Sequence, residues 1–388
     1  MRPPASGVRL PGWPDPVFDD LLRAAAGPSV TAADAWRRFH RAFDLDRVDG
    51  DSYRLLATVA GNLDATVHPD LPDRARIAGI ARRTWFANQR AYANLARVVE
   101  GLGERGIEVL VAKGGALAVQ AFPGVAHRPF SDIDIYVRPD RRRDATDWFL
   151  REGYEPSGWI RDLDGRHAVG FVRGDLGGGD VFDLHALPPD GLRLRRHPER
   201  SADVLWEGSV PLVHGPVATR ALGPAEQLVL VLVHGLDVRS ESPLRGFADA
   251  AWIIRSTGGT LDWVRVLAFA NARRVHLEVR VGLRYVHEVI GVEVPAAVLA
   301  RPGHWAATTP RDRALLWART GAPPRHRQGP AGSAQRWLLR TEAEPLGGAA
   351  ADLVGFPRRV LEAQRRSGAR DRWYLPRVPT RWGRSSGS

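Results

Sequence analysis

Two spacings of apolar residues alternate along the chain. In residues 17–70, apolar positions recur every three or four residues, as they do on one face of a helix. Residues 72–105 continue this spacing and predict one long helix, which Gly103 and Gly106 end. Residues 107–187 change to short β-rich runs, and after them the helical spacing returns in several successive segments. The pattern therefore predicts helices, then a unit that contains strands, then helices.

The middle of the chain supplies the strands of the predicted core. The predicted strands span residues 107–112, 131–137, 167–173 and 180–187, and residues 210–222 predict a small extended pair. Helices are expected between the first two strands and after the second, over residues 114–122 and 138–154. This order predicts an α+β fold, in which a small mixed β-sheet core is embedded in N- and C-terminal helical regions.

The same pattern suggests four segments. They are an N-terminal helical region (1–72), an α/β core (73–190), a helical domain (191–320) and a basic, Arg-rich C-terminal segment that is partly disordered (321–388). Within the last segment, residues 321–334 and 367–388 are poor in apolar residues and rich in Gly, Pro, Ser and Arg, which predicts a linker and a tail.

Composition excludes several classes of protein. Apolar residues make up 44% and charged residues 26% of the chain, as is typical of globular proteins. No apolar run approaches the ~20 residues that a membrane-spanning helix needs. There are no cysteines, so disulfides and thiolate metal sites are excluded. The N-terminus has no apolar segment typical of a secretory signal, and we expect a cytoplasmic location.

Positive charge is concentrated at the C-terminal end. Residues 301–388 hold 17 arginines and 6 acidic residues, a net charge of +11 that equals the net charge of the whole chain. Such a segment would suit a nucleic acid, an acidic partner or an anionic membrane surface, and we place this contact in residues 321–388. A solvated tail has the same composition.

Two carboxylates in the second predicted strand are the first candidates for chemistry. Asp132 and Asp134 alternate with Ile133 and Ile135, so the acids share one face of the strand while the isoleucines face a core. Adjacent carboxylates repel each other and need a cation or solvent. Oxygen ligands at this spacing suit Mg²⁺, which typically binds one or two carboxylates together with substrate phosphates.

A third carboxylate is expected from a later strand. Asp183 shares a strand face with His185, whereas Asp180 lies on the opposite face of a regular strand. Three acids would hold two Mg²⁺ or Mn²⁺ ions, which activate a hydroxyl and stabilise displacement at phosphorus. In this hypothesis Asp183 is the ligand nearest the acceptor hydroxyl and His185 is a supporting residue.

The segment before these acids is suited to a polyphosphate. Lys113, the only lysine among 55 basic residues, ends a predicted strand and is followed by Gly114 and Gly115, which begin a helix. Glycines let the backbone approach a ligand, and a helix N-terminus offers N–H groups to phosphate. Lys113 and Arg128 would neutralise an NTP, and Ser131 completes the predicted nucleotide contacts.

These motifs resemble the DNA polymerase β-like nucleotidyltransferase superfamily. The resemblance rests on the Lys-Gly-Gly turn at 113–115, Asp-Ile-Asp at 132–134 and Asp-Leu-His at 183–185. Within that superfamily the chain is similar to a branch of uncharacterised bacterial nucleotidyltransferases. The resemblance covers roughly residues 75–290 and implies catalytic and metal-binding roles for Asp132, Asp134 and Asp183.

Further residues extend the resemblance or depart from it. The helical segments around His234 and Asp249 look like the helical region of that branch. We expect His234 to be a core histidine in an apolar helix and Asp249 to be structural. The branch commonly has an aromatic residue where this chain has Ala186, which affects packing beside the third acid.

Together, the motifs and the resemblance predict a metal-dependent nucleotidyltransferase. It would move an NMP from an NTP to an unidentified acceptor hydroxyl and release pyrophosphate. The acceptor would be a small molecule, a peptide or a protein. Two rival hypotheses are a nucleic-acid-binding or RNA-modifying protein led by the basic tail, and a non-catalytic, toxin–antitoxin-like partner that binds NTP. A metallohydrolase using His167, His185 and His234 is disfavoured, because these histidines lack paired ligand spacing.

Overall fold

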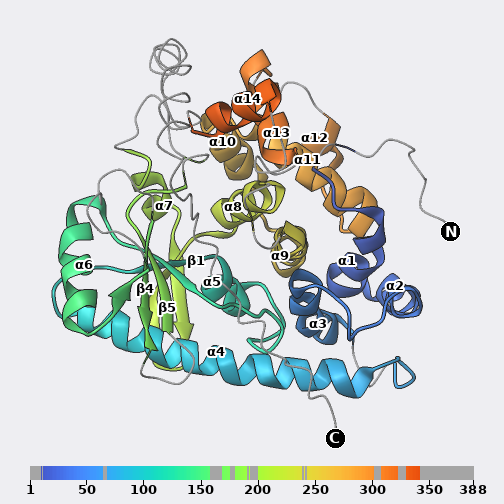
Figure 1. The fold of residues 1–388 in the computed structure, drawn as a ribbon, viewed down its shortest axis with the longest axis horizontal. Coiled ribbons are helices and arrows are strands. Elements are labelled where there is room, and N and C mark those ends of the chain that lie inside the picture. Colours follow the sequence, from blue (N-terminus) through green and yellow to red (C-terminus); the bar gives the residue numbers. More distant parts are fainter. Residues whose placement is uncertain are drawn as a thin grey trace, which may run out of the picture. The chain divides into compact units, whose positions relative to one another are not determined.

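A mixed sheet built from the predicted strands organises the chain (Figure 1). The computed structural model describes residues 10, 12–63, 68–157, 168–174, 180–189, 192, 200–237, 240, 243–300, 307–321 and 329–340. Its strands are β1 (Leu110–Ala112), β2 (Ile133–Tyr136), β3 (Glu155–Pro156), β4 (Ala168–Arg173), β5 (Asp180–His185), β6 (Val210–His214) and β7 (Val217–Ala221). They lie in the order β3-β4-β5-β2-β1-β7-β6.

The pairing of these strands is mixed. β2 runs parallel to β5, and β1 runs parallel to β7, while the other neighbouring pairs are antiparallel. The hairpin of β6 and β7 comes from the extended pair expected at 210–222, and β7 joins it to the central sheet through β1. The predicted fold class, a small mixed sheet within helical regions, is confirmed.

Helices precede and follow the sheet. They are α1 (Asp19–Ala26), α2 (Ser29–Ala42), α3 (Gly50–Asn62), α4 (Arg74–Gly103), α5 (Lys113–Gln120), α6 (Arg142–Arg151), α7 (Asp203–Glu207), α8 (Pro224–Leu236), α9 (Pro243–Ser256), α10 (Trp263–Ala272), α11 (His276–Tyr285), α12 (Ala296–Ala300), α13 (Pro310–Thr320) and α14 (Gly329–Arg340). Short 3₁₀ turns occupy Pro16–Phe18 and Pro139–Arg141, and a π-helical turn occupies Val286–Ile290.

The longest helix contacts both the N-terminal helices and the sheet. The long helix predicted over 72–105 is confirmed as α4, which runs past α3 in Figure 1 and also packs against β7. The linker predicted at 321–334 was wrong for its last residues, because α14 begins at Gly329. The tail predicted at 367–388 lies outside the described residues. The four segment boundaries stay a prediction.

The two faces of the sheet differ in what they bury. Ile133 and Ile135 on β2 and Phe182 and Leu184 on β5 point into one hydrophobic cluster, to which α4 and α6 also contribute. The alternation of side chains therefore directs the intervening Asp134 and Asp183 to the other face, toward α8 and α9. No described helix is both long and apolar enough to cross a membrane.

A pair of glycines sets the distance between α8 and α9. A Cβ atom added to Gly246 would lie 2.6 Å from the Cα atom of Gly235 and 2.6 Å from the carbonyl oxygen of Val231. Only glycine permits so close a crossing without displacing a backbone. The crossing also places His234 and Arg245, each the residue before one of these glycines, on the wall of one cavity.

This crossing generates a stability prediction. Gly246→Ala should lower the free energy of unfolding by about 1–3 kcal/mol, because the added methyl group meets backbone atoms that cannot move aside easily. The matched control is Gly79→Ala in α4, where an added Cβ meets no atom within 4 Å and alanine favours the helix. Urea unfolding of both variants measures the difference, and equal stability in the two would contradict the close crossing.

Candidate active site

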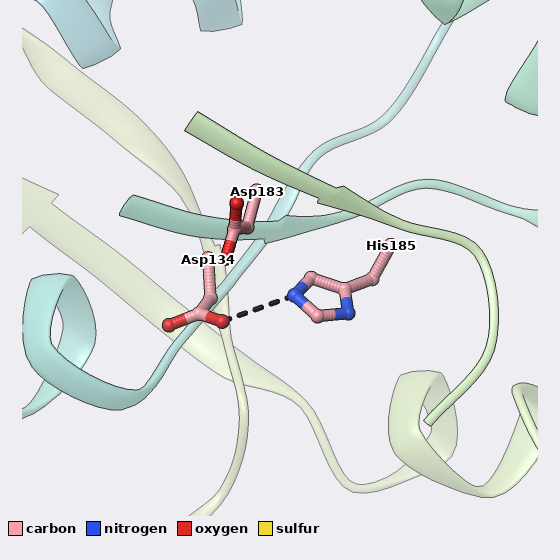
Figure 2. A group of neighbouring side chains, drawn as sticks. All are labelled: Asp134, Asp183 and His185. Atoms are coloured by element: carbon pink, nitrogen blue, oxygen red, sulfur yellow. Dashed lines mark hydrogen bonds and ion pairs between the residues drawn. The ribbon is translucent and has the colours of Figure 1, made fainter. Parts of the chain in front are cut away.

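Asp134 and Asp183 lie directly opposite each other on neighbouring parallel strands. The register of β2 and β5 pairs the two residues, and it also pairs Tyr136 with His185 two positions further on. Figure 2 shows the two carboxylates side by side, with the ring of His185 approaching Asp134. One ligand atom from each of Asp134, Asp183 and His185 lies within 4.8 Å of the others. The strand pairing thus brings together the acids that the sequence predicted from separate strands.

Asp134 is buried but well supplied with hydrogen-bond donors. Its Oδ1 atom accepts from Lys113 Nζ at 2.6 Å and from His185 Nε2 at 3.0 Å. Burial alone would raise the pKa of Asp134, but the charge of Lys113 and the hydrogen bond from His185 outweigh it and hold that pKa well below its usual value. Asp134 therefore stays ionised, although its side chain is only 4% exposed.

Asp183 has a different environment. Within the part of the chain that the structure describes, its carboxylate receives no hydrogen bond and forms no ion pair. Burial, followed by repulsion from Asp134, raises the pKa of Asp183 to about 6. Two facing carboxylates thus differ in protonation: one is held as an anion and the other is poised to bind a proton or a cation.

The turn between β1 and α5 directs Lys113 at Asp134. Lys113 has a φ of 46°, in the left-handed region that few residues other than glycine adopt. Its backbone N–H donates to the buried Gln227 of α8 at 3.1 Å, which fixes the turn. Burial lowers the pKa of Lys113, but Asp134 more than offsets this and the pKa is raised. The ammonium and the carboxylate therefore form a stable ion pair.

Stacking fixes the position of His185 on the other side of Asp134. The ring of Tyr136 stacks on that of His185 with centroids 4.6 Å apart and an angle of 15° between the planes. Both side chains are almost fully buried. Burial, with the charges of Asp134 and Asp183, raises the pKa of Tyr136 well above its usual value, so the phenol stays neutral.

These residues line a cavity of about 520 Å³. Of the predicted site residues, all but Gly115 contribute to its wall: Lys113, Gly114, Arg128, Ser131, Asp132, Asp134, Asp183 and His185. Asp132 precedes the first residue of β2 and is partly exposed, and it accepts a hydrogen bond of 3.3 Å from the Ser131 hydroxyl. Asp132 therefore lies outside the tight group of Asp134, Asp183 and His185.

Arg128 faces a buried acid. Its Nε and Nη2 atoms donate to the two carboxylate oxygens of Asp249 at 3.0 and 2.7 Å, and Nη1 donates to the carbonyl of Pro129 at 2.7 Å. Asp249 thus has the structural role that we expected. A Cβ atom on Gly114 would lie 2.7 Å from Phe130 and 2.8 Å from Arg128, so the packing of this segment requires glycine there.

The expectation of a core position for His234 was wrong. Along α8 its neighbours from Ala225 to Val233 are buried, but the His234 side chain is exposed on the cavity wall. Its Nε2 atom lies 3.3 Å from the Ser240 hydroxyl. Partial removal from water by the cavity walls, followed by repulsion from Lys113, lowers its pKa to about 4 and keeps the imidazole neutral. His167, the third histidine of the rival metallohydrolase, lies outside the described residues.

Comparison with known proteins identifies the family. A family model described as "Uncharacterised nucleotidyltransferase" matches residues 51–291, more than half of the chain. The chain belongs to this nucleotidyltransferase family. No curated protein matches this family member significantly. A similar solved structure is an antigenic nucleotidyltransferase-like protein from Paracoccidioides brasiliensis, with a TM-score of 0.36 and 11% identity, covering 54% of this chain and 96% of that chain.

Sequence reasoning missed two arginines on the cavity wall of this nucleotidyltransferase. Arg54 comes from α3 and Arg245 from α9, both outside the strands that carry the acids. With 55 basic residues in the chain, neither had a distinguishing local pattern. Only the packing of α3 and α9 near the sheet reveals their position.

The raised pKa of Asp183 predicts a pH dependence in metal-free buffer. The pKa of about 6 in the folded state exceeds the unfolded value near 3.9, so the native state holds its proton more tightly. The stability that comes from this proton is present below about pH 4 and is lost as the pH rises to about 6. Asp183→Asn should therefore gain stability relative to the unmodified chain across this range.

Thermal unfolding in a chelating buffer measures this effect. The Tm difference between Asp183→Asn and the unmodified chain should grow by about 2 °C or more between pH 4 and 6.5, then level off. A difference that is constant with pH, or that falls as the pH rises, would contradict the raised pKa of Asp183 in the folded state.

Proposed function

We propose that this family member transfers a nucleoside monophosphate from an NTP to an acceptor hydroxyl. The observation that carries the proposal is the facing pair of Asp134 and Asp183, at the wall of a cavity that also contains Lys113. Acids on two adjacent strands beside a cationic turn suit phosphoryl transfer, because this chemistry depends mainly on positioning and charge stabilisation.

The donor set at this site suits a divalent cation. Asp183 lacks a hydrogen-bond donor within the described residues, and its neighbour Asp134 is ionised, so a cation would offset the repulsion between them. Oxygen donors of this type favour Mg²⁺ or Mn²⁺. Asp134 and Asp183 would hold one ion, and Asp132 at the partly exposed edge would help to hold a second. Such ions neutralise polyphosphate charge and stabilise the displacement at phosphorus.

The side chains around the acids have distinct roles in this proposal. His185 positions Asp134, because its Nε2 atom donates to the carboxylate and its ring is held by Tyr136. Lys113 uses one N–H group on Asp134, and its ammonium has two further donors for phosphate oxygens. The neutral His234 on the opposite wall provides a polar contact for nucleotide or acceptor.

Asp183 is the proposed proton acceptor. The acceptor oxygen forms a bond to the α-phosphorus, the bond between the α-phosphorus and its bridging oxygen breaks, and pyrophosphate leaves. The proton of the acceptor hydroxyl passes to the Asp183 carboxylate. Asp183 suits this role by position, because it lies on the cavity wall opposite Asp134 and receives no hydrogen bond within the described residues.

The alternative hypothesis, a nucleic-acid-binding or RNA-modifying protein that acts through its basic C-terminal segment, stays a prediction. Of residues 321–388, the structure describes only Gly321 and helix α14, so the proposed nucleic-acid or anionic-surface contact lies mostly outside the described residues. The predicted cytoplasmic location also stays a prediction.

Labelled nucleotide tests the proposed reaction. Each of the four NTPs, labelled at the α-phosphate, is incubated with the protein, Mg²⁺ and fractionated small molecules, peptides or proteins. We expect Mg²⁺-dependent appearance of the label in one acceptor fraction together with pyrophosphate. Asp134→Asn should lower the rate by at least about 100-fold, because it removes an ionised group at the reacting phosphate.

The matched control for this test is Asp147→Asn. Asp147 is exposed on α6, which packs on the opposite side of the sheet, so the same change of charge there should leave the rate unaltered. Equal transfer rates in Asp134→Asn and the unmodified chain would refute the proposed function.

A further inference from the structure

Three arginines approach the cavity from three separate segments. Arg54 comes from α3, Arg128 from the segment between α5 and β2, and Arg245 from α9. These side chains lie on the same cavity as the acids of β2 and β5. The cavity therefore combines acidic groups from the sheet with cationic groups brought by helices outside it.

Arg128 is already neutralised within the protein. Its guanidinium binds both carboxylate oxygens of Asp249, and the two side chains are only 8% and 5% exposed. A buried pair of this kind is costly to separate, because either partner would be left as an uncompensated charge. A bound anion would therefore gain little from Arg128.

Arg245 lacks such a partner. Its one ion pair among the described residues is a long one, in which Oδ1 of Asp51 lies 4.0 Å from the arginine Nε. The other oxygen of Asp51 accepts from the backbone N–H of Leu244 at 2.9 Å. The Nε atom of Arg245 is buried and has no hydrogen-bond partner among the described residues. Among the described residues, its guanidinium donates only one hydrogen bond, a long one of 3.4 Å from Nη1 to the Pro129 carbonyl.

The surroundings of Arg245 also disfavour its charged form. Burial and then repulsion from Arg128 lower the pKa of Arg245 to about 10, with Arg54 acting in the same direction, and the charges of Asp249 and Asp51 offset this only in part. A buried cation beside like charges is unfavourable unless an anion compensates for it. The arrangement therefore fits an anionic ligand at Arg245.

The cavity is large enough for one ligand to contact both the acids and the arginines. A volume of about 520 Å³ is within the range that holds one drug-sized ligand. A ligand that reaches the acids of the sheet would therefore also reach the arginines. In the reaction proposed above, that ligand is an NTP, whose polyphosphate chain is its most strongly charged part.

We propose that Arg245, supported by Arg54, binds the polyphosphate chain of the nucleotide. The planar guanidinium donates two parallel hydrogen bonds to phosphate oxygens, and its Nε atom gains the acceptor that it lacks in the protein. The choice of nucleotide as ligand rests on the proposed function. Arg128, by contrast, holds Asp249 and the segment beside Gly114 in place.

Calorimetry without turnover tests this site. Inorganic tripolyphosphate and each of the four NTPs are titrated into the unmodified protein, Arg245→Gln and Arg245→Lys. We expect Arg245→Gln to weaken tripolyphosphate and all four NTPs by a similar factor of about 10–100, because the contact is with phosphate and not with the base. Arg245→Lys should recover only part of this loss, since an ammonium lacks the planar fork.

Arg284→Gln is the matched control. Arg284 lies on α11, is 46% exposed and pairs with Glu288. The Arg284→Gln variant therefore loses the same charge away from the cavity, and it should bind tripolyphosphate as the unmodified chain does. Thermal unfolding of each variant confirms that it is folded.

Two outcomes would overturn the assignment. One is unchanged affinity for tripolyphosphate and NTPs in Arg245→Gln. The other is unchanged nucleotide affinity with a raised KM for the acceptor in the transfer assay, which would assign Arg245 to an anionic group of the acceptor. Because tripolyphosphate binding does not depend on turnover, the loss of the proposed transferase activity and the loss of this site are read separately.

Discussion

The parallel register between β2 and β5 is the constraint on which the site depends. It sets Asp134 directly opposite Asp183 and Tyr136 opposite His185. The hydrophobic residues on the other face of the same strands hold this register, because a slip of one residue would exchange the apolar and acidic faces. The burial of isoleucine, phenylalanine and leucine side chains thus keeps the two carboxylates side by side despite their mutual repulsion.

Residues outside the sheet determine how the two carboxylates differ. Lys113 and His185 stabilise the anion at Asp134, whereas Asp183 lacks equivalent donors in the described part of the chain. The close crossing of α8 and α9 then closes the opposite wall with His234 and Arg245. Strand pairing places the acids, and helix packing gives the cavity its cationic side.

Much of this arrangement follows from local sequence pattern. The alternation around Asp134 and Asp183 predicted one shared face, and the mixed sheet within helical regions agrees with the fold. Such patterns are readable because strand side chains alternate with a period of two, whatever the rest of the chain does.

The remainder depended on contacts between distant residues. Arg128 pairs with Asp249, which lies 121 positions away, and no local pattern specifies that pair. His234 was expected in the core because its helix is apolar almost throughout, yet its side chain is exposed on the cavity wall. Arg245 was indistinguishable from the many other arginines until the crossing of α8 and α9 placed it beside Arg128.

The most direct test of the central claim is an anomalous difference map from crystals grown with Mn²⁺ and a non-hydrolysable NTP analogue. The account predicts a manganese peak within about 2.5 Å of carboxylate oxygens from both Asp134 and Asp183. Bound analogue with manganese at neither carboxylate would contradict it.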